Sequence, residues 1–322
     1  MLTIAIPTYN RKQQLLRTLK ALSKQTKDEF KVVISDNNSD YDVQKMIMDE
    51  FNDEFRNKIV YKRRNVNIGA DNNIIGLFEL VEDEWMWMIS DDDVIHNDAV
   101  AKVYELIKKN NDCSVIQFSE SDIYTSDMQF NDLESYVKSM YDIWNRKTSL
   151  IIAGNLYACY NKLYKMDSIK ECLYIPFKYN YSCMTTGLVV LSALKNGKKV
   201  TFTQAKIMDI TPPEWSSMMV ALGNRIVDDI DFGIAKDLKK KLLCLISFPY
   251  RVLIRHWLEK ENHYDENLYI EKLYYGYYKY HLPVLDRLNY WLNIKVCSVD
   301  ILYKLNLKIR QLEKSIRNKY KK

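Results

Sequence analysis

The chain has 322 residues, of which 47% are hydrophobic and 28% are charged, a composition typical of a globular protein with a sizeable core. Its 8 glycines and 6 prolines are too few for flexible linkers or low-complexity repeats. The formal net charge of +5 is unevenly distributed. Residues 236–322 hold 19 Lys and Arg against 9 Asp and Glu, whereas residues 1–235 carry an excess of acids, so we expect two regions with different surroundings.

The six cysteines form no Cys-x-x-Cys pair and have no histidine at ligand spacing, so they indicate neither a zinc site nor a disulfide framework. The N-terminal residues lack the basic and long apolar segments of a secretory signal. No apolar run reaches the ~18 residues of a membrane-spanning helix. We therefore expect a cytoplasmic protein that is not integral to a membrane.

The first ninety residues alternate between strand-like and helix-like patterns. Short runs rich in apolar residues at residues 2–6, 31–36 and 59–61 predict strands. Leucines at helical spacing separate the first two runs, and such a strand–helix–strand unit predicts a parallel sheet with a right-handed crossover. A helix expected at residues 74–81 leads into a fourth strand at residues 85–89.

The pattern is weaker in the rest of the chain. We expect strands at residues 114–118, 156–160 and 199–202, a helix at residues 186–195, and a loop-rich insertion over residues 119–149. From about residue 228 the sequence predicts long helices, the last with apolar residues three and four apart. The expected domains are therefore residues 1–228 and a helical region over residues 229–322.

Three consecutive aspartates, Asp91, Asp92 and Asp93, follow the apolar run of the fourth strand. Close carboxylates repel one another unless a cation joins them, so this pattern favours a divalent metal site. Aspartates also begin helices, because they accept hydrogen bonds from free backbone N–H groups. The residues that follow, His96 to Val100, do resemble a helix start, so both interpretations stay open for the triple acid alone.

Three polar segments follow expected strands, at residues 7–10, 36–40 and 90–93. In open α/β sheets ligands bind outside the carboxyl ends of the strands. Because these three segments all lie at such ends, we expect them to meet along one edge of the sheet and to form a binding site there.

The order of these motifs resembles family 2 glycosyltransferases of the GT-A fold. The motifs read IAIPTYNR at residues 4–11, VVISDNNSD at residues 32–40, NIG at residues 67–69 and ISDDD at residues 89–93. The SDDD form, with Asp71 after the NIG motif, resembles the branch of abequosyltransferase-like O-antigen enzymes. The resemblance implies an α/β fold with a Rossmann-like, mostly parallel sheet flanked by helices, and an α-helical C-terminal region.

The resemblance also implies transfer of a sugar from a nucleoside diphosphate sugar, with UDP favoured, to a saccharide or lipid-linked oligosaccharide acceptor. The implied nucleotide-binding residues come from the four motifs: Pro7, Thr8, Tyr9, Arg11, Asp36, Asn38, Asn67, Gly69, Asp71, Asp91 and Asp92. From the residues alone, Pro7 and Tyr9 also suit strand termination and packing. The Asn-x-Gly pair suits a turn equally well.

Mn²⁺ or Mg²⁺ is the cofactor that the resemblance implies. Alignment on the apolar Val94 favours Asp92 as the metal ligand, helped by one neighbouring acid. A plain Asp-x-Asp pattern selects Asp91 and Asp93 instead, so all three aspartates are candidates.

One position departs from the family pattern. In many members a Glu-Asp pair opens the helix before the last strand and supplies the general base, but Thr185 and Thr186 stand there in this chain. A threonine hydroxyl cannot accept a proton near neutral pH. The base then comes from elsewhere, or the chain has no conventional base, while an inverting outcome remains the expectation. The unranked candidates are Asp122, Asp127, Asp209 and Glu214.

Eleven tyrosines and two tryptophans accompany the basic excess of residues 236–322. Aromatic and cationic side chains together suit an anionic bilayer surface, so peripheral attachment to the inner face of the cell membrane is one expectation. Packing on the catalytic domain or on a second subunit is the other. Nucleic acid is not expected as a partner, because no nucleic-acid-binding motif accompanies the basic residues.

Two other functions stay open. A sugar nucleotidyltransferase uses similar carboxylate and metal chemistry, but its glycine-rich phosphate loop is missing after the first strand. A non-catalytic homologue that binds a partner is conceivable because threonines replace the usual base.

Overall fold

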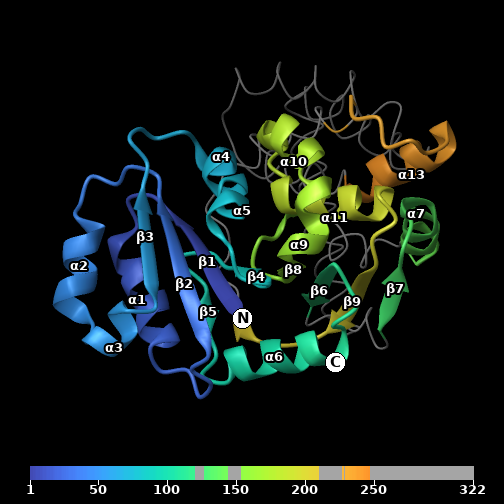
Figure 1. Ribbon diagram of the computed structural model, residues 1–322. Coiled ribbons are helices and arrows are strands. Elements are labelled where there is room, and N and C mark those ends of the chain that lie inside the picture. Colours follow the sequence, from blue (N-terminus) through green and yellow to red (C-terminus); the bar gives the residue numbers. More distant parts are fainter. Residues whose placement is uncertain (120–126, 144–153, 210–226, 228, 247–322) are drawn as a thin grey trace, which may run out of the picture. The chain divides into compact units, whose positions relative to one another are not determined.

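The computed structural model describes residues 1–119, 127–143, 154–209, 227 and 229–246 (Figure 1). The chain divides into two compact units, Met1–Pro249 and Tyr250–Lys322, and every described residue belongs to the first. The helices expected beyond residue 247 lie outside the described residues. The expected boundary at residue 228 stays a prediction.

An eight-stranded sheet forms the centre of this unit. The strands are β1 (Leu2–Thr8), β2 (Phe30–Asp36), β3 (Ile59–Arg63), β4 (Trp85–Met88), β6 (Val115–Ser119), β7 (Met128–Phe130), β8 (Lys162–Lys165) and β9 (Val200–Gln204). Their order in space is β3-β2-β1-β4-β8-β6-β9-β7. Strands β8 and β7 run antiparallel to their neighbours, and the other pairs are parallel. A separate two-stranded ribbon pairs β5 (Val94–Ile95) with β10 (Met208–Asp209).

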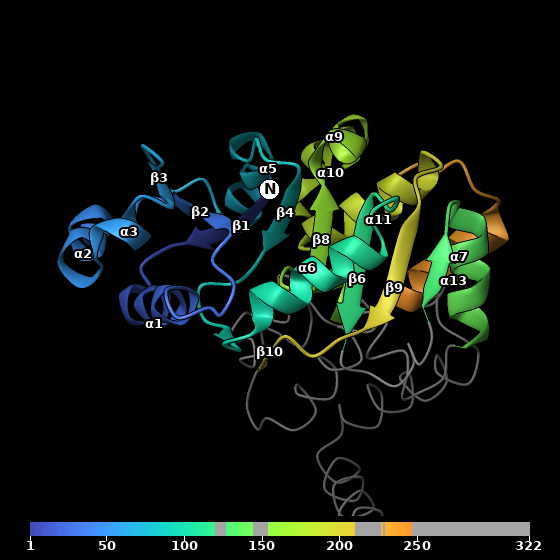
Figure 2. The ribbon, with the colours of Figure 1, turned by 60° about the horizontal axis from the view of Figure 1, so that its bottom comes forward.

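Helices lie on both faces of the sheet (Figures 1 and 2). They are α1 (Lys12–Leu22), α2 (Val43–Glu50), α3 (Asp53–Arg56), α4 (Ala70–Ile75), α5 (Leu77–Leu80), α6 (Ala99–Lys109), α7 (Leu133–Asp142), α9 (Met166–Ile169), α10 (Tyr174–Lys178), α11 (Thr185–Lys195) and α13 (Lys236–Ile246), with 3-10 turns at Lys170–Cys172 and Asn180–Ser182. The predicted α/β fold with a mostly parallel sheet is confirmed.

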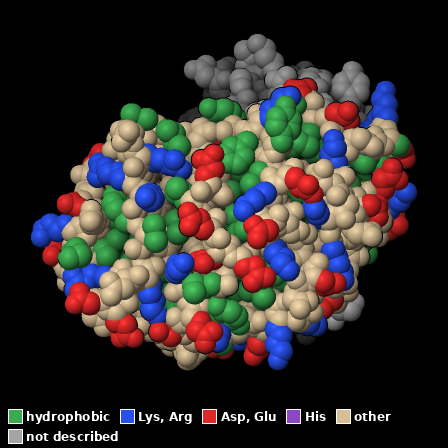
Figure 3. Space-filling view, viewed as in Figure 1, with side chains coloured by type: hydrophobic (Ala, Val, Ile, Leu, Met, Phe, Trp, Pro, Cys, Tyr) green, Lys and Arg blue, Asp and Glu red, His purple; other side chains and the backbone are tan. Residues whose placement is uncertain are grey.

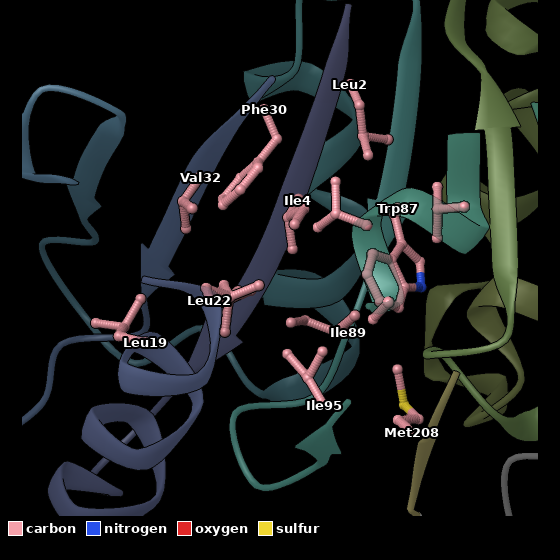
Figure 4. Packing of buried hydrophobic residues seen from close by; sticks show 14 of the residues in the cluster. Leu2, Ile4, Leu19, Leu22, Phe30, Val32, Trp87, Ile89, Ile95 and Met208 are labelled. Carbon is pink, nitrogen blue, oxygen red and sulfur yellow. The ribbon is translucent and has the colours of Figure 1, made fainter. Parts of the chain in front are cut away.

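Strand alternation places one apolar face of the sheet against α1 and α6. Leu2 and Ile4 of β1 and Trp87 of β4 belong to one buried cluster with Leu19 and Leu22 of α1 (Figure 4), because side chains two residues apart on a strand share a face. These side chains are almost completely buried. The core therefore fixes the positions of β1, β2 and β4, the strands that carry the polar segments at their carboxyl ends.

Most expected elements of the first ninety residues match the structure within one or two residues. The helix expected at residues 74–81 begins earlier, at Ala70, and divides into α4 and α5 at Gly76. A glycine at the junction and an asparagine-rich first turn hid the helix from the sequence pattern.

The strand expected at residues 156–160 is wrong. Residues 154–157 are helical, and β8 runs over Lys162–Lys165 instead. The sequence misled because a lysine normally marks the surface, whereas the side chain of Lys162 is fully buried. The ammonium lies among the oxygens of the preceding turn, with Nζ donating to the carbonyl of Asn155 (2.6 Å) and to Asn161 Oδ1 (2.9 Å).

The insertion over residues 119–149 contains more regular structure than expected. Strand β7 pairs with β9, and α7 begins where the Asp132 carboxylate accepts a hydrogen bond from the Ser135 backbone N–H (2.7 Å). Helix α7 buries Leu133, Val137 and Met140, an apolar set at helical spacing that the many polar residues obscured.

Acidic and basic side chains are interspersed on the face of the molecule shown in Figure 3. Within the described part of the chain, none of the helices is long and apolar enough to cross a membrane.

Candidate functional site

The carboxyl ends of β1, β2 and β4 meet at one edge of the sheet, as expected. Strand β1 pairs with β2 up to Thr8 and Asp36, but its pairing with β4 ends at Ala5 and Met88. The Ile89 N–H still donates to the Ala5 carbonyl (3.0 Å). The next donor on that side of β1 would belong to Pro7, which has no N–H. The chain after β4 therefore leaves the sheet as Ser90–Asp93, which we call the acid loop.

The acid loop is tied to the first polar segment by charged and hydroxyl groups. Thr8 Oγ1 donates to Asp91 Oδ2 (2.7 Å). Arg11 Nη1 lies 3.2 Å from Asp91 Oδ1 and 2.6 Å from Asp92 Oδ2. Asp91 is only 4% exposed. Thr8, Arg11, Asp91 and Asp92, predicted from two separate motifs, thus form one cluster.

The backbone of the acid loop is held independently of these carboxylates. Thr18 Oγ1 donates to the Asp91 carbonyl (3.0 Å), and Arg17 Nη2 donates to the Asp92 carbonyl (2.5 Å). Within the loop, Ser90 Oγ donates to Asp92 Oδ1 (2.5 Å), and the Ser90 N–H donates to Asp93 Oδ2 (3.2 Å). The loop is therefore preorganised, with Asp93 turned back toward its own backbone.

The electrostatics of the cluster follow from burial. Desolvation raises the pKa of Asp91 to about 6, although the Thr8 hydroxyl and the Arg11 charge both oppose this rise. Burial lowers the pKa of Arg11, but the charges of Asp91 and Asp92 outweigh it and leave the pKa raised. Arg11 therefore stays cationic, and the two carboxylates share a single guanidinium.

The second polar segment joins the same edge. The Asn10 N–H donates to Ser39 Oγ (2.9 Å), and Asn10 Nδ2 donates to Asp40 Oδ2 (2.8 Å). Asp36 is 0% exposed. Its Oδ1 accepts the Ser39 N–H (2.9 Å), and its Oδ2 accepts the Tyr61 hydroxyl (2.8 Å). In these contacts Asp36 shapes the segment, so a direct contact with a nucleotide base stays a prediction.

Sequence reasoning missed Tyr41, which follows this segment directly. Burial, and then the charges of Asp36 and Asp91, raise the pKa of the Tyr41 hydroxyl to about 12. The phenol thus lies in the field of both acids. Its only sequence signal was its place after the VVISDNNSD motif.

The contacts of Asn67 and Gly69 shape a turn. Asn67 Oδ1 accepts from Asn37 Nδ2 (2.8 Å) and from the Gly69 N–H (2.9 Å). Gly69 has φ +83°, a conformation that suits glycine, and α4 begins directly after it. Asn38 Oδ1 accepts from Arg63 Nη2 (3.0 Å). Tyr9 is exposed at the end of β1.

Asp71 contacts the start of α11. Its Oδ1 accepts the Thr185 hydroxyl (3.1 Å). Burial raises the pKa of Asp71 above its ordinary value, and hydrogen bonds from Thr185 and Cys183 offset only part of this rise. Thr186 is 2% exposed, and its hydroxyl donates to the Ala158 carbonyl (2.9 Å). The residue at the family's usual base position is therefore a buried packing residue.

The described base candidates differ in their distance from the acid loop. Asp209 lies opposite Val94 in the β5–β10 ribbon, directly beside the loop. Lys206 and His96, 3.3 Å away, lower its pKa. Asp127 lies by the far edge of the sheet, where it pairs with Lys109 (2.8 Å) and accepts from Thr203 (2.6 Å). Burial raises the pKa of Asp127, but Lys109 and Thr203 outweigh burial, so the pKa is lowered overall.

The two other candidates, Asp122 and Glu214, lie outside the described residues. For a metal, the donor chemistry fits, because the three aspartates offer the carboxylate oxygens that Mg²⁺ and Mn²⁺ prefer. No group of three or more His, Cys, Asp or Glu side chains is arranged around an ion position in the described part of the chain. One or two carboxylates suffice where a diphosphate and water complete the shell.

The model of the family "Glycosyl transferase family 2" matches residues 3–173, more than half of the chain. The chain therefore belongs to glycosyl transferase family 2, and it has the GT-A fold, as predicted. The protein is thus a member of a glycosyltransferase family.

Among curated proteins, the chain is similar to abequosyltransferase RfbV of Salmonella typhimurium, with 26% identity over 184 residues, 56% of this chain and 50% of that protein. It is also 27% identical over 111 residues to an uncharacterized glycosyltransferase of Haemophilus influenzae, covering 34% of this chain and 35% of that one. The chain thus spans half or less of these curated relatives.

Two solved structures are similar in fold. S. aureus TarS 1-349 in complex with UDP-GlcNAc has a TM-score of 0.63 at 14% identity, covering 96% of this chain and 91% of that one. The mannosyltransferase PcManGT from Pyrobaculum calidifontis, in complex with GDP-Man and Mn²⁺, has a TM-score of 0.55 at 10% identity, covering 92% and 86%. At these identities the likeness supports the fold alone.

Proposed function

We propose that this protein transfers a sugar from a nucleoside diphosphate sugar, UDP favoured, to a saccharide acceptor carried on a lipid, in the synthesis of a cell-surface polysaccharide. The observation that carries the proposal is the cluster of Thr8, Arg11, Asp91 and Asp92 at the carboxyl ends of β1 and β4. Family membership and the likeness to RfbV support it.

In this proposal, the first two polar segments bind the nucleoside. Pro7 and Tyr9 would contact the base and ribose, with Asn38, Asn67, Gly69 and Asp71 lining or shaping the same edge. Asp36 would select the base if the Tyr61 hydroxyl released Asp36 Oδ2, which it now holds by a hydrogen bond. Otherwise Asp36 would act indirectly, by shaping the segment that contacts the base. The complexes of TarS with UDP-GlcNAc and of PcManGT with GDP-Man support a nucleotide sugar as the ligand class.

The acid loop is the proposed diphosphate end of the site. Asp92, helped by Asp91 or Asp93, would hold Mn²⁺ or Mg²⁺, which supplies positive charge to the leaving diphosphate. The fixed backbone of the loop keeps the carboxylates in place, so little reorganisation is needed when charge develops.

The proposed step inverts the configuration at the sugar carbon C1. The acceptor oxygen bonds to C1 while the bond from C1 to the diphosphate oxygen breaks, and the acceptor proton passes to a base. Thr186 does not supply that base, since its buried hydroxyl donates a hydrogen bond to the Ala158 carbonyl. Asp209 is the described candidate beside the acid loop, although Lys206 and His96 hold its pKa low.

A turnover assay tests the proposal against its rivals. The protein is incubated with UDP-, GDP-, CDP- and dTDP-sugars and Mn²⁺, and release of nucleoside diphosphate is followed with and without membrane extract as a source of acceptor. A glycosyltransferase releases nucleoside diphosphate. A nucleotidyltransferase instead releases pyrophosphate from a nucleoside triphosphate and a sugar phosphate, and a non-catalytic homologue releases neither.

The location of the protein stays part of the proposal. We propose a cytoplasmic protein whose residues 229–322 contact an anionic membrane surface or a second copy of the chain. Flotation with anionic and neutral vesicles, together with light scattering, separates the two. Binding to neither vesicle and a monomeric mass would reject both contacts.

A further inference from the structure

Arg11 places one nitrogen between two carboxylates of the acid loop. Its Nη1 lies 3.2 Å from Asp91 Oδ1 and 2.6 Å from Asp92 Oδ2. The two remaining oxygens are also engaged, because Asp91 Oδ2 accepts from Thr8 and Asp92 Oδ1 accepts from Ser90. Asp91 Oδ1 and Asp92 Oδ2 are therefore the two oxygens that lie within reach of one atom, Arg11 Nη1.

A divalent ion between those two oxygens is incompatible with Arg11 in this position. Mg²⁺ lies about 2.1 Å from its oxygen ligands, which is closer than the Arg11 nitrogen. An ion there would be in van der Waals conflict and in direct charge repulsion with the guanidinium. Arg11 and an ion bridging Asp91 and Asp92 thus compete for the same oxygens.

The surroundings of Arg11 allow it to leave without dismantling the loop. Its side chain is 34% exposed, and it contacts the carboxylates, whereas the loop backbone is held by Thr18 and Arg17. A long side chain that starts at the N-terminus of α1 can move a few ångströms by rotation about its own bonds. The guanidinium fork also matches phosphate oxygens as well as carboxylates.

We propose that Arg11 is a displaceable counter-cation. It pairs with both Asp91 and Asp92 in the ligand-free protein, yields the two oxygens that it contacts to the divalent ion, and then pairs with the diphosphate of the donor. This inference rests on the proposed function. It makes Arg11 both a competitor of the free ion and a ligand of the nucleotide, so its loss should change the two affinities in opposite directions.

Mn²⁺ binding without nucleotide tests the first half. Arg11→Gln is compared with Arg17→Gln, which removes the same charge from a residue whose guanidinium donates to the loop backbone and not to the carboxylates among the described residues. Calorimetry or electron paramagnetic resonance of Mn²⁺ should give an affinity about 10-fold tighter for Arg11→Gln than for Arg17→Gln, since the ion no longer has to displace a charge-assisted hydrogen bond. Arg11→Lys keeps the positive charge on a shorter side chain that reaches the two carboxylates less well, so its Mn²⁺ affinity should fall between those of wild type and Arg11→Gln.

Nucleotide binding tests the second half. At saturating Mn²⁺, Arg11→Gln should bind UDP about 10-fold more weakly than Arg17→Gln, with uridine affinity unchanged. Equal Mn²⁺ affinities, or equal UDP affinities, in the two glutamine variants would overturn the inference and leave the proposed function intact. If neither the wild type nor any variant bound Mn²⁺, with UDP present or absent, the inference and the proposed metal would both fail. Circular dichroism confirms the fold of each variant, and Arg11→Lys carries the test if Arg11→Gln does not fold.

Discussion

The acid loop and the start of α11 both present polar side chains at the end of an element, but they use them differently. At the acid loop, polar groups from distant segments converge on carboxylates, as Thr8 and Arg11 do on Asp91. At the start of α11, Thr186 is buried and its hydroxyl donates a hydrogen bond to the backbone carbonyl of Ala158. The first arrangement is organised to meet a charged ligand, whereas the second stabilises packing. A family position alone does not identify a catalytic group.

The largest expected effect is a loss of activity in Asp92→Asn, which tests the acid loop. The substitution removes a charge that the loop holds in place, and loss of one such preorganised group typically lowers kcat by about 10²–10³. The measurement is the rate of nucleoside diphosphate release from the best donor with Mn²⁺. Asp98→Asn is the matched control, because Asp98 is an exposed aspartate that pairs with Lys102 (2.9 Å). Retention of activity within a factor of ten in Asp92→Asn would argue against a role at the diphosphate.

Lys162→Met tests the packing that supports the start of α11. Nζ of Lys162 donates to the same Ala158 carbonyl that accepts from Thr186. Burial lowers the pKa of Lys162 to about 7 from its ordinary 10.5, so between these pH values the unfolded chain binds more protons than the native protein. The free energy of unfolding should therefore rise with pH in this window, by up to about 1.4 kcal/mol per pH unit. The oxygen acceptors around Nζ offset part of this slope.

Urea unfolding at pH 7, 8 and 9 measures this slope. The Lys162→Met variant should lack this slope, whereas Lys165→Met, three residues along β8 and partly exposed, should keep it. Parallel stability curves for wild type and Lys162→Met would contradict the account of Lys162.

Asp36→Asn sharpens the assignment of the nucleoside end. If Asp36 contacts the base, UDP affinity should fall about 10-fold, the loss of one charge-assisted hydrogen bond, while affinity for inorganic pyrophosphate should not change. Tyr61→Phe removes only the hydroxyl that now donates to Asp36. Equal losses of UDP affinity in the two variants would mean that Asp36 acts only through the shape of the segment.

Thr186→Val should have the smallest effect. It removes the hydroxyl but keeps the shape of the side chain, so the Ala158 carbonyl loses one of its donors, at a cost of about 1 kcal/mol in the free energy of unfolding. Turnover should stay within about 3-fold of wild type, and Thr186→Ser should restore the stability. A loss of turnover as large as that of Asp92→Asn would place a catalytic function at the start of α11 after all.

These two regions also differ in what could be predicted from the sequence. The strands before the acid loop were readable because β1, β2 and β4 are continuous apolar runs with polar ends, and the rule for ligand sites in α/β sheets placed those ends together. The pairing of Arg11 with both Asp91 and Asp92 could not be read, because it depends on side-chain rotamers across 80 residues of sequence.

Around α11 the sequence pattern failed for a different reason. The position of β8 was missed because a buried lysine does not look like a core residue. The contact of Asp71 with Thr185 joins residues separated by 114 positions, and local periodicity carries no information about such pairs. Burial of polar groups is a property of the assembled fold.

The most direct test of the central claim is a calorimetric titration of UDP into the protein with and without Mn²⁺. The account expects one binding site whose affinity rises with Mn²⁺ and whose dependence on Mn²⁺ is lost in Asp92→Asn. Absence of heat with UDP, GDP, CDP and dTDP at saturating Mn²⁺ would contradict a nucleotide site at the edge formed by β1, β2 and β4.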